Sequence, residues 1–293
     1  MGTVLITGGH GFVGRHLQRQ LGKRAVPTDA DVTDPSAIAE AIGSNRPDSV
    51  VHLAARSSVA DSWTGTQDVW RVNVLGTVNV LEAVRTEASD ARMLVVSTGQ
   101  VYGQAEKIPT PEESPIAPLS PYAASKAAAE LACAQSELDI VITRPFQHEG
   151  PGRDERFAIG SWTRQIARLE AAGGGRLQVG DLTSRRDITD VRDVCRAYEL
   201  LLDRTVPGGA YNVASGTAVR MQDVLGMLIA QARCPIDVEV DPTRSRPTDL
   251  AAVCGDASKL KAATGWAPTI PLEQTLVDAL EAARAAVTEV SSV

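Results

Sequence analysis

The stretch Thr3-Val4-Leu5-Ile6-Thr7-Gly8-Gly9-His10-Gly11-Phe12-Val13-Gly14 decides the fold of this 293-residue chain. Its first five residues are typical of a short buried strand, and its last residues continue into a helical pattern. A strand, a glycine-rich turn and a helix in this order are the context that a dinucleotide-binding site requires. Gly8 permits the tight turn, Gly11 lets backbone N–H groups reach a pyrophosphate, and Gly14 lets the helix pack closely on the strand. The spacing is GxxGxxG with an additional Gly9, rather than GxGxxG.

Strand-like and helical patterns alternate after this stretch. The strand-like runs lie at residues 25–28, 49–55, 92–96, 140–143 and 211–214. Because helical patterns separate them, we expect an α/β fold, a Rossmann-type doubly wound parallel sheet with helices on both faces. The regularity weakens after residue 150, which predicts a smaller C-terminal α/β domain. We expect residues 1–150, with about 185–215, to bind NAD(P), and residues 151–184 and 216–293 to bind the substrate.

Acidic residues follow the second strand. An acid at this place commonly accepts hydrogen bonds from the adenosine ribose hydroxyls, which favours NAD over NADP. Asp29 and Asp31 are both candidates, and the sequence leaves the choice open. Asp34 precedes Pro35 and Ser36, so we interpret it as the N-cap of the next helix.

The stretch Ser120-Pro121-Tyr122-Ala123-Ala124-Ser125-Lys126 holds the main catalytic candidates. Ser120 suits a helix N-cap and Pro121 the first helical position, so a helix should begin here. Tyr122 and Lys126 are four residues apart and share one helix face. An ammonium close to a phenol lowers the pKa of the phenol toward the range of an acid/base catalyst. The alternative is a surface Tyr and Lys on an ordinary amphipathic helix.

Two other polar residues have similar double interpretations. Thr98 follows the strand at 92–96, where ligands bind in doubly wound sheets, and it is either a partner for a substrate oxygen or a turn former. Asn73 lies inside a long helical pattern at about 68–85. It either makes a specific hydrogen bond or is simply exposed.

Composition limits the function classes. The chain is 43% hydrophobic and 22% charged, as in a globular protein, and its net charge is -7 with a pI near 5.2. An acidic chain is not expected to bind nucleic acid or an anionic membrane. The four cysteines are far apart and without metal-ligand spacing, so we expect reduced thiols and no metal site. The strand-like run at Thr3 leaves no room for a signal peptide and no apolar run is long enough to span a bilayer, so we expect a cytoplasmic protein.

Together these segments resemble the extended short-chain dehydrogenases/reductases that act as epimerases, dehydratases and reductases of sugar nucleotides. Four motifs match in the family's order: TGGHGFVG, HLAA, STGQVYG and SPYAASK. The resemblance spans nearly the full length. It is strongest to the branch that reduces GDP-4-dehydro-6-deoxy-D-mannose, on the stretches HLAARSSVADSW (52–63), SPYAASK, TRPFQHEGPG (143–152), RRDITDVRD (185–193), YNVASG (211–216), RSRPTDL (244–250) and TGWAPTIPLEQTL (264–276).

The resemblance implies roles for individual residues. Tyr122 would donate a proton, Lys126 would hold the nicotinamide ribose, and Thr98 stands where the family has its catalytic Ser or Thr. The implied cofactor, NADH or NADPH, would be bound by Gly8, Gly11, Phe12, Val13, Gly14, Asp31, Val32, Leu53, Ala54, Ala55, Tyr122 and Lys126. The implied nucleotide-diphosphate sugar would be bound by Ser57, Thr98, Arg186 and Arg246, with the two arginines clamping the diphosphate.

Two departures from the family's pattern bear on function. Dehydratases of the family carry an acidic pair after the catalytic Thr, whereas this chain has Gly99 and Gln100, which cannot act as general acid or base. Related reductases usually have Asn-His-Ile where this chain has Gln147-His148-Glu149. A carboxylate at Glu149 would be unfavourable near a diphosphate unless it points away.

The sequence therefore predicts a reductase of the C4 keto group of a nucleotide-linked 4-keto-6-deoxyhexose, most specifically one that forms GDP-D-rhamnose. One alternative is a nucleotide-sugar 4-epimerase that retains NAD, and another is a non-catalytic dinucleotide-binding sensor. The nucleotide, the C4 stereochemistry and the choice of NADH or NADPH stay open. By resemblance, the helices at about 68–85 and 121–136 form a homodimer surface.

Overall fold

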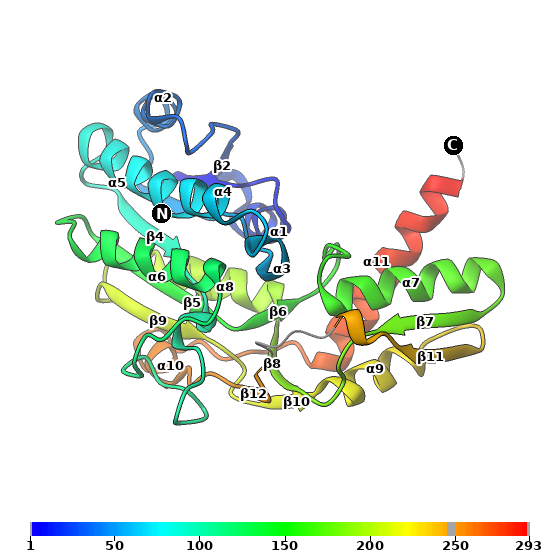
Figure 1. Ribbon diagram of the computed structural model, residues 1–293. Helices are drawn as coiled ribbons and strands as arrows, with labels where there is room; N and C mark the ends of the chain where they lie inside the picture. The colour runs from blue at the N-terminus through cyan, green and yellow to red at the C-terminus, as the bar shows by residue number, and fades with distance from the viewer. Residues whose placement is uncertain (1, 245–249, 292–293) are drawn as a thin grey trace.

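A six-stranded parallel sheet forms the centre of the computed structural model, which describes residues 2–244 and 250–291 (Figure 1). In spatial order its strands are β2 (Ala25–Thr28), β1 (Val4–Thr7), β3 (Ser49–His52), β4 (Arg92–Val96), β5 (Ile140–Pro145) and β9 (Gly209–Val213). All neighbouring pairs are parallel. The chain passes from β1 to β2 on one side and then crosses to β3 on the other, so the winding reverses at β1. The predicted Rossmann-type fold is confirmed.

Helices cover both faces of this sheet. One face carries α1 (Phe12–Leu21) and α8 (Val191–Leu201), and the other carries α2 (Pro35–Asn45), α5 (Gly76–Glu87) and α6 (Pro121–Ala134). Successive strand residues point to opposite faces. In β1, Val4 and Ile6 pack with α1 and α8, while Leu5 packs with α2 and α5. Because both faces are covered, the strands are continuous apolar runs rather than alternating ones.

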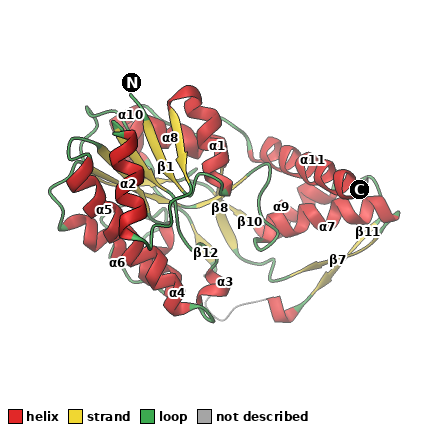
Figure 2. Cartoon of the chain, turned by 90° about the horizontal axis from the view of Figure 1, so that it is seen from above, coloured by secondary structure: helices red, strands yellow, loops and turns green. Residues whose placement is uncertain are grey.

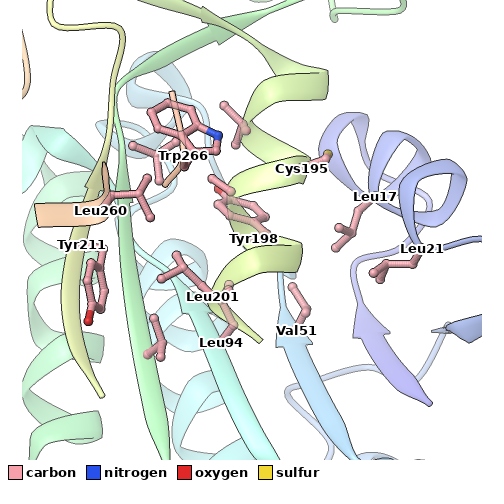
Figure 3. Packing of buried hydrophobic residues seen from close by; sticks show 14 of the residues in the cluster. Leu17, Leu21, Val51, Leu94, Cys195, Tyr198, Leu201, Tyr211, Leu260 and Trp266 are labelled. Carbon is pink, nitrogen blue, oxygen red and sulfur yellow. The ribbon is translucent and has the colours of Figure 1, made fainter. Parts of the chain in front are cut away.

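A residue from the C-terminal segment completes one of these two cores (Figure 3). Trp266 packs with Tyr198 and Leu201 of α8 and with Leu260 of α10 (Ser258–Thr264). Its side chain is 1% exposed, and its Nε1–H donates to the Asp193 carbonyl oxygen at 2.9 Å. The core of the central sheet therefore depends on chain far beyond its last strand.

A second group of elements lies beside the sheet (Figure 2). It contains α7 (Ala158–Ala172), α9 (Met221–Ile229), α11 (Leu272–Ser291) and the parallel pair β7 (Gly175–Val179) and β11 (Ile236–Val240). These elements have an apolar core of their own. Between the two groups, β8 (Arg185–Asp190) pairs with β6 (Gln147–Glu149), β10 (Ala218–Arg220) and β12 (Ala252–Val253), outside the six-stranded sheet. The domain limits given above stay a prediction.

The stretch RRDITDVRD (185–193) contains three buried aspartates that hold distant segments of the chain together. The carboxylate of Asp187 accepts from the backbone N–H groups of residues 215, 216 and 255. Asp190 caps α8 and accepts from Thr275 Oγ1 at 2.8 Å, and Asp193 accepts from the N–H groups of residues 269 and 270. Buried carboxylates are tolerated when hydrogen bonds replace water. The three residues therefore tie the C-terminal segments to β8 and α8.

The expected helix starts are present. Ser120 Oγ accepts from Ala123 N at 3.1 Å at the start of α6, and Asp34 accepts from Ser36 N at 2.9 Å at the start of α2. The remaining short elements are η1 (Gly22–Arg24), α3 (Val59–Ser62), α4 (Thr66–Trp70), η2 (Arg71–Leu75), η3 (Gly99–Tyr102) and η4 (Pro242–Arg244). Within the described residues, every helix is too short or too polar to cross a membrane.

Candidate active site

A cleft of about 810 Å³ opens at the carboxyl ends of the central strands. The residues that follow β1, β3 and β4 line one part of it, together with the end of β5 and the start of β6. The other part is lined by residues of α7 and α9 from the second group and by residues at the start of β8, which lies between the groups. Ligands bind at this edge of a doubly wound sheet, where the winding reverses.

The glycine-rich turn at the cleft tolerates no side chains at two positions. Gly8 has φ +68°, and a Cβ there would lie 2.7 Å from the backbone N of Ala54. A Cβ on Gly14 would lie 2.3 Å from the carbonyl oxygen of Gly9. Helix α1 begins at this turn without a side-chain cap, which leaves its first N–H groups available. A close backbone turn before an uncapped helix end fits a pyrophosphate.

A smaller hollow of about 370 Å³ adjoins the cleft and shares Gly8, Gly11, Ala54 and Ala55 with it. Asp29, Asp31 and Val32 line this hollow. The hydrogen bonds that Asp31 accepts from the backbone and the hydroxyl of Thr33 lower the pKa of its carboxyl group. The exposed carboxylate of Asp29 lies 2.9 Å from Nε2 of the His10 ring. Both acids thus lie where an adenosine ribose would bind.

Thr98 is in the lining of the cleft, whereas Tyr122 and Lys126 are buried behind it and are not among the lining residues. Thr98 Oγ1 accepts from Gln100 N at 3.2 Å, so the hydroxyl is oriented by the turn it caps. Thr98 acts on the pKa of the Tyr122 phenol, so the two hydroxyl groups are near each other, while Ser120 and Ala123 of the same helix end line the cleft. Lys126 is 3% exposed and has no hydrogen-bond or ion-pair partner among the residues that the structure describes. A buried ammonium without an acceptor fits a site that a ribose hydroxyl would complete.

The expectation that Lys126 lowers the pKa of Tyr122 is wrong for this structure. Burial raises the pKa of Tyr122 to about 12, although the nearby Thr98 hydroxyl and the charge of Arg153 act in the opposite direction. Burial also lowers the pKa of Lys126 to about 8. Desolvation outweighs the local charges at both groups. Tyr122 is therefore a neutral phenol at neutral pH, which suits a proton donor.

Asn73 makes the specific hydrogen bonds that its position suggested. The helical pattern at about 68–85 is not one α-helix, because a π turn, η2, lies between α4 and α5 and contains Asn73. The Asn73 side chain accepts from Arg56 N at 2.8 Å and donates to Ser125 Oγ at 2.9 Å. Ser125 in turn donates to the carbonyl oxygen of Tyr122 at 2.7 Å. The side chain thereby links the segment after β3 to the first turns of α6.

The expected substrate-binding residues have different outcomes. Ser57 and Arg186 line the cleft, and Arg186 Nη1 donates to the carbonyl oxygen of Leu250 at 2.7 Å. Arg246 lies outside the described residues. Arg244, two residues earlier, lines the cleft and pairs with Asp241 at 3.3 Å.

Sequence reasoning missed Arg153, which lines the cleft directly after the quoted stretch 143–152. Its Cζ lies 3.6 Å from the ring centroid of Phe157 and 4.8 Å from that of Phe12. It pairs with Glu149 at 3.7 Å, and its Nε has no hydrogen-bond partner. Glu149 is fully buried, and burial raises the pKa of its carboxyl group. Glu149, which replaces the isoleucine usual in related reductases, therefore has the Arg153 guanidinium beside it. The signal in the sequence was the position of Arg153, a charged residue directly after the family-like stretch 143–152.

Comparison with known proteins gives a consistent result. The model of the GDP-mannose 4,6 dehydratase family matches residues 22–279. The chain is 35% identical over 287 residues to the GDP-6-deoxy-D-mannose reductase of Pseudomonas aeruginosa, which covers 93% of this chain and 94% of the relative. It is 28% identical to a GDP-mannose 4,6-dehydratase of Yersinia enterocolitica, over 83% of this chain and 75% of the relative.

Solved structures agree with this result. The structure of RMD from Pseudomonas aeruginosa complexed with NADPH superposes with a TM-score of 0.87 at 33% identity, over 98% of this chain and 100% of the other. A UDP-glucose 4-epimerase from Thermotoga maritima with UDP-glucose has a TM-score of 0.83 at 25% identity, over 97% of this chain and 99% of the other.

Proposed function

The chain belongs to the GDP-mannose 4,6 dehydratase family of extended short-chain dehydrogenases/reductases, and we propose that within it the chain is an NAD(P)H-dependent reductase. The proposed reaction reduces the C4 keto group of a nucleotide-linked 4-keto-6-deoxyhexose. In its most specific form it converts GDP-4-dehydro-6-deoxy-D-mannose to GDP-D-rhamnose. NADH and NADPH are both candidate cofactors, since the family uses NAD(P).

The observation that carries this proposal is the turn after Thr98. A Cβ on Gly99 would lie 2.9 Å from the ring of Phe146, so a carboxylate side chain does not fit there. Gln100 lines the cleft, and its amide cannot exchange a proton at neutral pH. Elimination of water from a sugar needs such an acid/base pair, whereas reduction of a ketone needs only one proton donor. The site thus favours reduction over dehydration.

A reduced nicotinamide bound in this cleft would be the source of the hydride for the C4 carbon. The Thr98 hydroxyl donates a hydrogen bond to the C4 oxygen and fixes its position. The Tyr122 phenol, neutral at working pH, donates its proton to that oxygen as the carbon receives the hydride. The Lys126 ammonium would hold the ribose hydroxyls of the cofactor. Orientation of the reacting groups in the cleft supplies much of the rate.

The proposed cofactor site runs along the two adjoining hollows. The turn at Gly8, Gly11 and Gly14 with the start of α1 would hold the pyrophosphate. Asp31 and Val32 would hold the adenosine end, with Asp29 as the alternative acid, and residues 53–55 would border the cofactor. Arg153 would offer its guanidinium to an oxygen of the bound ligands, because a buried Nε–H without an acceptor is unfavourable.

The proposed substrate site lies on the other side of the cleft. Arg186 and Arg246 would bind the diphosphate, and Ser57 would contact the sugar. The cleft position of Arg186 supports this assignment. The pairing of Glu149 with Arg153 supports it as well, because the pair reduces the repulsion between that carboxylate and a diphosphate.

A 4-epimerase is the second candidate, because the same catalytic set can oxidise and re-reduce C4, and because the Thermotoga maritima epimerase has a similar fold. The two functions differ in how they use the cofactor. A thermal-shift screen of GDP, dTDP, UDP and CDP identifies the nucleotide, and oxidation of added NADH or NADPH is then followed with the matching 4-keto sugar. Stoichiometric oxidation supports the reductase. Tightly bound NAD in the purified protein, with turnover of a nucleotide sugar and no added cofactor, contradicts it.

The proposal includes a cytoplasmic homodimer. All four cysteines are free thiols, as expected in a reducing compartment. Large apolar side chains, Trp70, Leu75, Val78 and Leu131, are exposed on α4, η2, α5 and α6. These are the segments expected to form the dimer surface, and their exposure supports that expectation.

A further inference from the structure

A buried ion pair lies beside the catalytic set and has no role in the reaction proposed above. Glu130 of α6 and Arg144 of β5 have side chains that are 5% and 8% exposed. Arg144 Nη2 donates to Glu130 Oε2 at 2.6 Å, and Arg144 Nε donates to both carboxylate oxygens at 3.1 Å. A buried ion pair contributes little net stability relative to apolar side chains of similar size. Its presence here therefore suggests a purpose other than stability.

The pair holds both ends of the turn that contains Thr98. Ser97, directly before Thr98, donates its hydroxyl to Glu130 Oε1. Arg144 Nη1 donates to the hydroxyl of Tyr102, the last residue of η3, at 2.9 Å. Arg144 also immediately precedes residues 145–147, which line the cleft. One ion pair thus joins the Thr98 turn, the catalytic helix and the end of β5.

The pair also sets the charge near Lys126. Glu130 lies one helical turn after Lys126, on the same helix face. Burial lowers the pKa of Lys126 to about 8, while Cys133 and Glu130 act to raise it. Burial raises the pKa of the Cys133 thiol to about 12, so this thiol is neutral at working pH. Glu130 is therefore the negative charge that opposes desolvation of the ammonium.

The other groups around Lys126 do not supply that charge. Burial lowers the pKa of His52 on β3 to about 3, and burial raises the pKa values of Tyr122 on α6 and Tyr102 on η3 to about 12 each. All three are neutral near pH 7. Arg144 is the cation paired with Glu130, so it partly offsets the charge of that carboxylate.

We propose that Glu130, fixed by Arg144, is a positioning residue of the catalytic set: it holds the Thr98 turn against α6 and keeps the Lys126 ammonium charged. This inference rests on the role proposed for Lys126 in binding the nicotinamide ribose. Removal of the carboxylate lowers the pKa of Lys126, so the ammonium is lost at lower pH. The alkaline limit of cofactor binding should move to lower pH as well.

The test is Glu130→Gln, with binding of NADH or NADPH followed by nucleotide fluorescence as a function of pH. We expect the alkaline midpoint of binding to fall by about one pH unit, within the range that an opposite charge a few ångströms away produces. Above that midpoint, binding should be about tenfold weaker than in the wild type. The alkaline limit of kcat/KM should move in the same direction.

Glu170→Gln is the matched control. Glu170 and Arg284 form a similar ion pair, 10% and 12% exposed, between α7 and α11. Glu170→Gln should lower the melting temperature much as Glu130→Gln does, but it should leave both pH limits unchanged. If Glu130→Gln also leaves them unchanged, its role is structural and the inference is wrong.

Two further arms keep the test decisive. If Glu130→Gln does not fold, the double variant Glu130→Gln/Arg144→Gln is used instead, because it leaves neither charge unpaired. The alkaline midpoint of cofactor binding should still move to lower pH in this variant. An unchanged midpoint overturns the inference. Cofactor binding requires no sugar. A wild-type protein that binds the cofactor but does not reduce the 4-keto sugar would therefore contradict the proposed function. The inference about Glu130 would still be decided by the pH dependence of cofactor binding.

Discussion

Tyr122→Phe tests the proposed chemistry most directly, because it removes one oxygen atom and keeps the ring. The lost phenol is the proposed proton donor, and general-acid catalysis typically contributes ~10²–10⁴-fold. We expect kcat to fall by at least ~10²-fold, which corresponds to about 2.7 kcal/mol of barrier at about 1.36 kcal/mol per factor of ten. Stability should change far less. A single hydrogen bond of the phenol would contribute only about 0.5–1.5 kcal/mol, and the apolar packing of the ring is retained.

The assay is the oxidation of reduced cofactor with saturating 4-keto sugar, together with the cofactor dissociation constant and thermal melting. Tyr211→Phe is the matched control. Tyr211 is buried, and its hydroxyl donates to the carbonyl oxygen of Pro207 at 2.8 Å, outside the cleft lining. It should lose a similar amount of stability and keep kcat. Near wild-type turnover in Tyr122→Phe, or an equal loss in both variants, would refute the mechanism.

Three other outcomes follow from the site and the fold. Arg246→Ala should raise KM for the nucleotide sugar about tenfold or more with kcat less affected, because a charge-assisted contact is worth roughly 1.5–3 kcal/mol; an unchanged KM would show that the diphosphate binds elsewhere. The wild-type protein should sediment as a dimer at micromolar concentration, and Leu131→Glu, at an exposed apolar position of α6, should sediment as a monomer; a monomeric wild type contradicts the expectation. Asp187→Ala should lower the free energy of unfolding by at least about 3 kcal/mol, since it leaves buried backbone donors unpaired. Asp203→Ala, which removes an exposed carboxylate that accepts from Thr205, should cost much less in the same denaturant titration.

Local signals were sufficient for the central sheet and for several helix starts. The strand at residues 25–28 has the predicted limits, and the caps at Asp34 and Ser120 have the predicted hydrogen bonds. These features depend on neighbours within a few residues, which the sequence displays directly. The glycine pattern was informative for the same reason, because Gly8 and Gly14 are required by close backbone contacts that only a missing side chain allows.

Features that depend on distant residues were less accessible. The pKa of Tyr122 was expected to fall because Lys126 is near in sequence, but burial by the folded chain raises it. The π turn around Asn73 interrupts a pattern that reads as one helix. The pair Glu130 and Arg144 joins a helix to a strand, and neither residue belongs to a spacing that would have drawn attention to it. Desolvation and contacts between elements follow from the tertiary fold rather than from local pattern.

The burial of Trp266 has a consequence for synthesis on the ribosome. The indole fills the core beneath α8, yet it is translated more than fifty residues after the last strand of the central sheet. In a nascent chain that has emerged only as far as β9, Trp266 is still missing, so the apolar side chains of Tyr198 and Leu201 that it would cover are exposed. Chaperones bind exposed apolar surface of this kind. The sheet can assemble early, but its final packing must wait until the C-terminal segment has left the exit tunnel. A stop codon before Trp266 should accordingly yield an aggregation-prone product, even though it would retain every residue of the glycine-rich turn and of the catalytic set.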